Sequence, residues 1–138
     1  MKSRIRKFVP EDAEAVVELW QDCGLTRPWN DPHADIERCL ASASGILLVA
    51  EDRVAPDQTP TLMGTVMVGS DGHRGWMYYL ASNPQHRGRG IGRALVAEAE
   101  QYLEVIGCLK AQLMVRSDNE VAIGFYEALG YEVNEVVV

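Results

Sequence analysis

The sequence lacks the features of a membrane, secreted or metal-binding protein. No stretch approaches the roughly 18 consecutive apolar residues of a membrane-spanning helix, and the N-terminus turns acidic at Glu11 before any run of signal-peptide length. The 3 cysteines are scattered, and none stands in the C-x-x-C spacing typical of metal or redox sites. We therefore expect a cytoplasmic protein with reduced thiols and no bound metal.

Basic residues are also in the minority, with 13 Lys and Arg against 20 Asp and Glu and a formal charge of −7. Nonspecific binding to nucleic acid or to an anionic membrane depends on a surplus of positive charge. The composition therefore predicts that neither is a partner. It slightly favours a cationic acceptor, although acidity is also what solubility alone requires.

The chain contains no repeat, linker or low-complexity segment, and its 138 residues suit one compact domain spanning residues 1–138. Apolar residues at i, i+3, i+4 and i+7 predict helices, and short apolar runs between turn residues predict strands. The expected helices cover about residues 10–24, 31–44, 90–106 and 118–130. The expected strands cover about residues 4–9, 45–51, 61–69, 76–82, 110–117 and 131–138. The second, third and fourth of these strands read as an antiparallel meander.

The most informative segment is the glycine-rich run at residues 87–92, placed where a strand ends and a long helix begins. Glycines allow a tight turn close to an anion, and the free N–H groups and positive dipole end of the helix attract phosphate oxygens. Because the dipole contributes only about 0.3–1 kcal/mol at an exposed site, we expect Arg87, Arg89 and Arg93 to supply further charge. The segment predicts a site for a diphosphate ligand.

Two other phosphate loops do not fit. A Walker loop would need Lys and Ser or Thr after the last glycine, where Arg93 and Ala94 stand. A dinucleotide loop would need the spacing G-x-G-x-x-G after a parallel strand, whereas this chain has G-x-G-x-G after an antiparallel meander. Neither a nucleoside triphosphatase nor a Rossmann enzyme is indicated.

The remaining pattern resembles the GNAT N-acetyltransferase superfamily. Its [RQ]-x-x-G-x-[GA] motif is matched by Arg87, Gly90 and Gly92, after a strand with the approach L-x-x-x-P at Leu80 and Pro84. A second family signature, N-x-x-[AS]-x-x-[FL]-Y-x-x-x-G-[FY], is matched at Asn119, Ala122, Phe125, Tyr126, Gly130 and Tyr131. Together the motifs cover residues 76–131, and the TRPWND and DGHRG segments look like a small bacterial branch often called YpeA-type.

The resemblance implies an α+β fold with a mixed, mostly antiparallel twisted sheet of six to seven strands and about four helices on both faces. It implies an enzyme that uses acetyl-coenzyme A as cosubstrate, without a metal, and transfers the acetyl group directly to a primary amine in a ternary complex. A small-molecule acceptor is slightly favoured over a protein N-terminus or lysine. The alternative is a coenzyme A-binding sensor without efficient catalysis, and an exposed last strand would also suit a homodimer.

By the same resemblance, the pantetheine arm should insert beside the strand at residues 77–82, and amides of the glycine loop should hold the pyrophosphate. The cofactor-binding residues implied are Leu80, Ala81, Ser82, Arg87, Gly88, Arg89, Gly90, Ile91, Gly92, Arg93, Asn119 and Ala122. Asn119 could equally be a helix cap. Tyr126 matches the family tyrosine that protonates the departing thiolate, and its alternative role is to pair with Phe125 in the core.

Many relatives carry a general-base Glu on the strand before the glycine loop, where this chain has Tyr78 and Tyr79. Asp71 and His73 are the substitutes that the sequence offers. The alternative is that D-G marks a simple hairpin turn. Glu18, Glu51 and Glu98 stay open as bases.

The loop between the first two helices borders the acceptor site in this family, which implies substrate contacts from Arg27, Trp29 and Asn30, with Asp71, His73 and Tyr79 as further candidates. The alternative for this loop is a helix start in which Asp31 caps the helix and Trp29 is the anchoring hydrophobe. Trp20 and Trp76 are expected in the core. A covalent role for Cys108 is not favoured.

Overall fold

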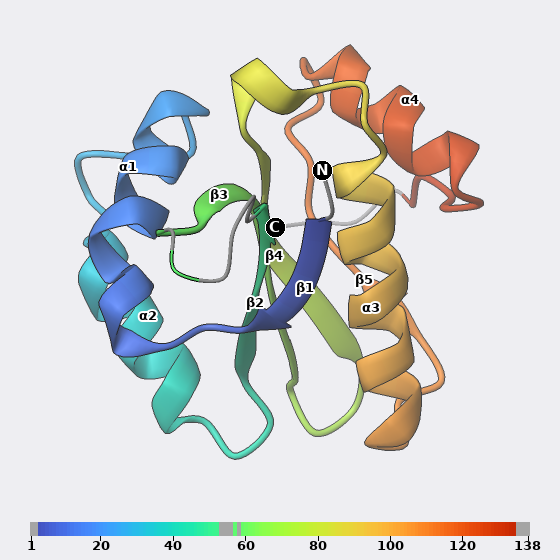
Figure 1. Ribbon diagram of the computed structural model, residues 1–138. Coiled ribbons are helices and arrows are strands. Elements are labelled where there is room, and N and C mark those ends of the chain that lie inside the picture. Colours follow the sequence, from blue (N-terminus) through green and yellow to red (C-terminus); the bar gives the residue numbers. More distant parts are fainter. Residues whose placement is uncertain (1–2, 53–56, 58, 135–138) are drawn as a thin grey trace.

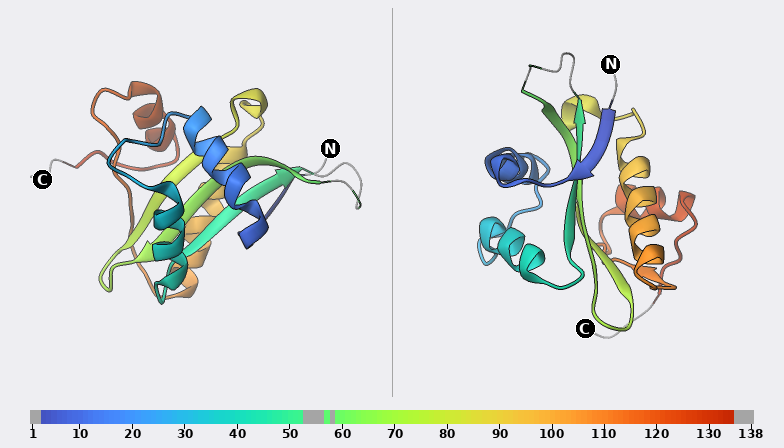
Figure 2. Two further views of the ribbon diagram at one scale, coloured as in Figure 1. Left: turned by 90° about the vertical axis from the view of Figure 1, so that its left-hand side faces the viewer. Right: turned by 60° about the horizontal axis from the view of Figure 1, so that its bottom comes forward.

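The computed structural model describes residues 3–52, 57 and 59–134, which form one sheet between two layers of helices (Figures 1 and 2). The strands are β1 (Ser3–Lys7), β2 (Ile46–Asp52), β3 (Thr61–Ser70), β4 (Gly75–Ser82) and β5 (Ala111–Gln112). The helices are α1 (Ala13–Asp22), α2 (Pro32–Ala41), α3 (Ile91–Val105) and α4 (Glu120–Ala128), with short 3-10 turns η1 (Pro10–Asp12) and η2 (Pro84–His86).

The strands lie in the order β1-β2-β3-β4-β5, and the first four pair antiparallel. The predicted meander is therefore confirmed. Strand β5 pairs parallel with β4 through two residue pairs only, Gly75 with Ala111 and Trp76 with Gln112. This parallel pair makes the sheet mixed, as expected.

Two expected strands are shorter or missing, so the described sheet has five strands rather than six or seven. The strand expected at 110–117 is reduced to Ala111–Gln112, and residues 131–134 of the expected last strand are not in a strand. A strand needs a partner for its backbone groups, and among the described residues neither 113–117 nor 131–134 pairs with another strand. The remainder of the last expected strand, residues 135–138, lies outside the described residues.

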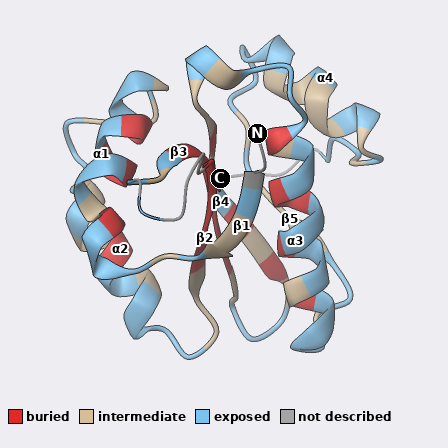
Figure 3. Ribbon diagram, viewed as in Figure 1, coloured by how far each residue is buried: buried red, intermediate tan, exposed pale blue. Residues whose placement is uncertain are grey.

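Helices α1 and α2 cover one face of the sheet, and α3 and α4 lie on the other (Figure 2). Each layer has its own core, because strand side chains alternate between the faces. Val49, Met67 and Ala81 pack with α1 and α2, whereas Val66, Val68 and Met77 pack with α3. In Figure 3 the buried residues of the helices accordingly line the sides that face the sheet. Among the described residues, no helix has the length and hydrophobicity needed to cross a membrane.

Candidate active site

The glycine loop joins the end of β4 to the start of α3 through the 3-10 turn η2. Gly88 and Gly90 have φ angles of 85° and 74°, in the left-handed region that favours glycine. Gly90 is the N-cap of α3 and, as a glycine, has no side chain with which to cap the helix. Since the first amides of a helix have no partner within it, the start of α3 is a suitable anion site.

Gly92 is the position where α4 packs across this helix start. A Cβ at Gly92 would lie 3.3 Å from Cζ of Phe125 and 3.8 Å from Oγ of Ser82. The absence of a side chain at Gly92 thus lets Phe125 of α4 approach the start of α3, and lets the start of α3 lie close to Ser82 at the end of β4. The two family motifs, far apart in the sequence, meet at this contact.

Among the residues that the structure describes, strand β4 has no partner strand next to the glycine loop, so its edge is open there. Its pairing with β5 stops at Trp76, and residues 113–117 are not in a strand. The backbone N–H of Asn83 donates to Met63 O at 2.7 Å, next to the Gly64–Ser82 pair. In an antiparallel ladder this pattern turns the N–H and C=O of Ser82 away from β3 and toward the open edge.

The three β4 residues expected to contact the cosubstrate have different surroundings. Leu80 packs against the α3 core, and Ala81 is buried on the α1 and α2 face. Ser82 O accepts a hydrogen bond from Sγ of Cys23, at 3.3 Å, from the residue that ends α1. The C-terminal end of α1 therefore contacts the backbone of β4 at its open edge. The sequence did not predict this contact.

Tyr126 lies on α4 between two other rings. Its ring meets Phe125 edge-on at a centroid distance of 5.1 Å and Tyr131 at 5.7 Å. Burial raises the pKa of Tyr126 to about 12, so the phenol keeps its proton throughout the neutral range. Among the described residues its hydroxyl has no hydrogen-bond partner. Tyr126 thus packs in a cluster with Phe125 and Tyr131, and its hydroxyl proton is available to donate.

Asn119 is the N-cap of α4, and its side chain accepts a hydrogen bond from the amide of Ala122 at 3.1 Å. The capping role considered for Asn119 is therefore observed. The amide of Ala122 is used by the same cap, so a contact from either residue to the cosubstrate stays a prediction.

Tyr79 has an unusual backbone, with a φ of 52°, the only positive φ among the described residues other than glycine. The register between β3 and β4 shifts between Thr65 and Met67, which places a bulge at this point of β4. The Tyr79 hydroxyl donates to Oδ2 of Asp35 on α2 at 2.6 Å. Burial, the hydrogen bond to Asp35 and the charge of Asp35 all raise the pKa of Tyr79, so it is a poor base.

Asp71 and His73 lie in the β3–β4 hairpin, at the opposite end of β4 from the glycine loop. The carboxylate of Asp71 accepts hydrogen bonds from the amides of Arg74 and His73 and from Nε1 of Trp76, at 2.7–2.8 Å. The Arg74 amide, the Trp76 indole and the His73 amide lower the pKa of Asp71 to about 2. This arrangement supports the turn interpretation, because a carboxylate so engaged is a weak base.

Glu51 is also unsuited to act as a base, since it is 3% exposed and pairs with Arg4 and Arg6. Trp20 is fully buried, as expected. Trp76, expected in the core, is only partly buried and lines a shallow depression with Cys39, Met67 and Tyr78. The expectation for Trp76 was wrong because its indole N–H finds its acceptor, Asp71, at the surface.

The loop between α1 and α2 is held by its own backbone. Nη1 of Arg27 donates to Gly24 O at 2.7 Å and to Thr26 O at 3.0 Å, and Asn30 N donates to Arg27 O. Asp31 caps α2 through the amides of His33 and Ala34, as predicted. Trp29 is 76% exposed, so it does not anchor this helix.

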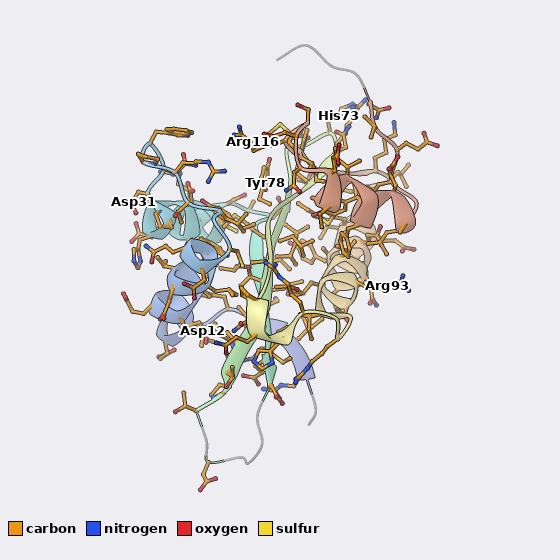
Figure 4. All side chains as sticks on the ribbon, turned by 90° about the horizontal axis from the view of Figure 1, so that it is seen from above. Asp12, Asp31, His73, Tyr78, Arg93 and Arg116 are labelled. Carbon is orange, nitrogen blue, oxygen red and sulfur yellow. The ribbon has the colours of Figure 1, made fainter. Side chains whose placement is uncertain are left out.

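The candidate residues thus fall into two groups. Residues 80–82 and the glycine loop lie at the end of β4 and the start of α3, and Phe125, which precedes Tyr126 on α4, packs against Gly92. Asp71 and His73 lie apart from them in the hairpin. Figure 4 shows, from above, Arg93 of α3 and Asp31 before α2 on opposite sides of the sheet, with Tyr78 between them. Among the described residues there is no cluster of three or more His, Cys, Asp or Glu that could hold a metal.

Comparison with known proteins identifies the class. Residues 13–131 match the profile of the Acetyltransferase (GNAT) family. The chain is 50% identical over 128 residues to an acetyltransferase of Pectobacterium atrosepticum, covering 93% of this chain and 86% of that protein. It is 46% identical over 134 residues to an acetyltransferase of Yersinia pestis, covering 97% and 91%. The chain belongs to the GNAT acetyltransferase family.

Solved structures agree on the fold. An aminoglycoside acetyltransferase, AAC(6')-Iy, in complex with a bisubstrate analogue superposes with a TM-score of 0.81 at 18% identity, covering 100% of this chain and 96% of that one. The predicted α+β acetyltransferase fold is therefore confirmed, with fewer strands than expected. Family membership also confirms that the chain is an acetyltransferase with acetyl-coenzyme A as its cosubstrate.

Proposed function

We propose that this protein transfers the acetyl group of acetyl-coenzyme A directly to the primary amine of a small molecule. The observation that supports this most strongly is the continuity of the open β4 edge with the uncapped, glycine-rich start of α3. An extended pantetheine arm can pair with the free backbone groups at the β4 edge while the pyrophosphate of the same coenzyme reaches the start of α3. The residues present therefore fit the cosubstrate.

In this proposal, backbone groups at residues 80–82 bind the pantetheine arm and polarise the acetyl carbonyl. The amine nitrogen attacks the carbonyl carbon, a C–N bond forms and the C–S bond breaks. Tyr126 gives its proton to the departing sulfur, and the proton lost by the amine passes to a base or to water. We assign no base, because Asp71 and Glu51 are engaged by other groups.

A small-molecule acceptor agrees with the acidic chain and with the acceptor type of the aminoglycoside enzyme that shares its fold. The exposed Trp29 and the partly buried Tyr79 are the acceptor contacts that we favour, since both lie on the α1 and α2 side of β4. A coenzyme A-binding sensor is the second candidate. It is favoured by the tyrosines that stand where relatives carry the general-base Glu.

The first test is calorimetric titration with acetyl-coenzyme A, followed by a screen of primary amines for release of the thiol. We expect binding and amine-dependent release. Binding without release from any amine would favour the sensor, and absence of binding would contradict both candidates.

A matched pair of glycine variants locates the pyrophosphate site. Gly90 and Gly72 both have positive φ angles, and a Cβ at either meets nothing within 4 Å. Gly90→Ala and Gly72→Ala should therefore cost a similar stability, about 1 kcal/mol each. Only Gly90→Ala should weaken coenzyme A binding, by about tenfold or more. Equal affinities in the two variants would contradict a phosphate site at the glycine loop.

A further inference from the structure

The strained backbone of Tyr79 is held by three contacts from elements far away in the sequence. A φ of 52° is costly for a residue with a side chain, and such a conformation persists only where the surroundings fix it. The bulge at Tyr79 lies directly before residues 80–82, of which Ser82 turns its N–H and C=O toward the open edge of β4. What fixes Tyr79 therefore also sets the direction of these peptide groups.

The first contact is a ring stack with Trp20 of α1. The two ring centroids are 3.8 Å apart and the planes differ by 10°. Trp20 is fully buried, so the Tyr79 ring rests on a side chain that is itself held by the α1 core. The stack directs the Tyr79 side chain toward the α1 and α2 face.

The second contact passes through the hydroxyl of Thr65, which is fully buried on β3. This hydroxyl donates to Tyr79 O at 2.9 Å and accepts from Nε1 of Trp20 at 2.8 Å. One buried group thus binds both the backbone of the bulge and the ring that lies on it. A valine at this position would leave the indole N–H without its acceptor and the carbonyl without its donor.

The third contact is the hydrogen bond of 2.6 Å from the Tyr79 hydroxyl to Asp35 of α2. Oδ1 of Asp35 is bound in turn by the guanidinium of Arg38, one turn further along the helix. Asp35 is therefore oriented from its own helix and fixes the outer end of the Tyr79 side chain.

We propose that Trp20, Thr65 and Asp35 are positioning residues that hold the Tyr79 bulge, so that the peptide groups at residues 80–82 point at the acetyl carbonyl. None of the three needs to touch the substrates. The inference rests on the proposed acetyl transfer, and it adds the residues on which the alignment of the carbonyl depends. A group that polarises a carbonyl acts only when it is placed accurately.

The test compares Thr65→Val with Thr65→Ser. Both change one group at the same buried site, and only serine keeps the hydroxyl. We expect Thr65→Val to lower kcat by about ten- to a hundredfold, and Thr65→Ser to keep kcat within about threefold of the original enzyme. Thr61→Val, at the exposed start of the same strand, is the control and should leave kcat unchanged.

A binding measurement separates positioning from general loss of structure. Contacts to the carbonyl favour acetyl-coenzyme A over coenzyme A, so Thr65→Val should reduce the ratio of their affinities while binding coenzyme A itself unchanged. Thermal melting should show the variant folded at the assay temperature. Parallel loss of kcat in Thr65→Ser and Thr65→Val, or loss of coenzyme A affinity together with melting temperature, would show a purely structural role and overturn the proposal.

A milder pair covers the case in which Thr65→Val does not fold. Asp35→Asn keeps an oxygen that can accept from Tyr79, whereas Asp35→Ala removes it, and we expect kcat to fall several-fold only in Asp35→Ala. Equal kcat values in the two variants would overturn the proposal. If the original protein binds coenzyme A but releases thiol with no amine, the proposed function has failed; if it turns over and the variants match it, only the positioning role has failed.

Discussion

Gly64 of β3 lies against the carbonyl oxygen of Ala81 on β4. A Cβ at Gly64 would come within 2.6 Å of that oxygen, and within 2.8 Å of Leu95 and 2.9 Å of Ile91 on α3. The close approach brings α3 directly onto the part of the sheet where β4 ends. The absence of a side chain at Gly64 therefore allows the start of α3 to pack close to the end of β4. These are the two parts of the candidate coenzyme A site.

Gly64→Ala should destabilise the protein, because the new methyl group meets a backbone atom as well as two core side chains. We expect a loss of about 2–3 kcal/mol in the free energy of unfolding, measured with urea. Gly124→Ala is the matched control: a Cβ there meets nothing within 4 Å, and Gly124 lies inside α4. This control should stabilise the protein by up to about 1 kcal/mol, and equal effects of the two substitutions would contradict the packing described.

A second stability prediction concerns the ion pairs that fasten η1 to the sheet. Asp12 is 8% exposed and receives hydrogen bonds from Arg6 at 2.8 Å and 3.0 Å and from the amide of Val9. Asp12→Ala leaves the Arg6 guanidinium with Glu51 and the carbonyl of Lys7 as partners, and should cost about 3 kcal/mol. Glu14→Ala, two residues further on at an exposed site, should change the stability by no more than about 0.5 kcal/mol.

The same carboxylate predicts how stability changes in acid. Burial raises the pKa of Asp12, but the hydrogen bonds from Arg6 and Val9 and the charge of Arg6 outweigh it, and the pKa is lowered overall. Its contribution is complete above the unfolded-state pKa of about 3.9 and is lost as the pH falls through the lower folded value. Urea unfolding at several pH values should therefore show a steeper acid decline for the original protein than for Asp12→Ala.

The sequence was sufficient to predict the glycine loop, the order of the helices and the antiparallel meander, because local periodicity and turn residues determine them. It was not sufficient to predict where β5 ends, since strand length depends on a partner that the local pattern does not reveal. The tertiary contacts of Tyr79 were likewise unpredictable. A buried tryptophan such as Trp20 needs an acceptor for its N–H, yet nothing in the sequence singles out Thr65, 45 residues away.

The loop candidates show the same limit. The motif at Asp31 predicted a cap correctly, because capping is local. The role of Asp71 was left open between a base and a turn residue, since only the fold shows that Trp76 and two amides bind its carboxylate.

Tyr126→Phe tests the proton donor. The substitution keeps the ring among Phe125 and Tyr131 and removes only the hydroxyl. We expect kcat to fall by about a hundredfold, with the affinity for acetyl-coenzyme A within about twofold of the original. Tyr131→Phe is the control, since it loses a hydrogen bond to Glu100 and should leave kcat nearly unchanged. Similar kcat values in the two variants would remove Tyr126 from the mechanism.

The final prediction uses the thiols already present and needs no substitution. Sγ of Cys23 lies 3.3 Å from Ser82 O, at the edge where the pantetheine arm should pair, whereas Cys39 lies on α2 and Cys108 follows α3. At a coenzyme A concentration about ten times its dissociation constant, alkylation of Cys23 by iodoacetamide should slow by about tenfold, because the occupied edge covers the thiol. Cys39 and Cys108 in the same sample report whether the ligand merely stabilises the whole protein. Equal protection of all three cysteines, measured by peptide mass spectrometry, would place the bound arm elsewhere, since only a ligand at the β4 edge singles out Cys23.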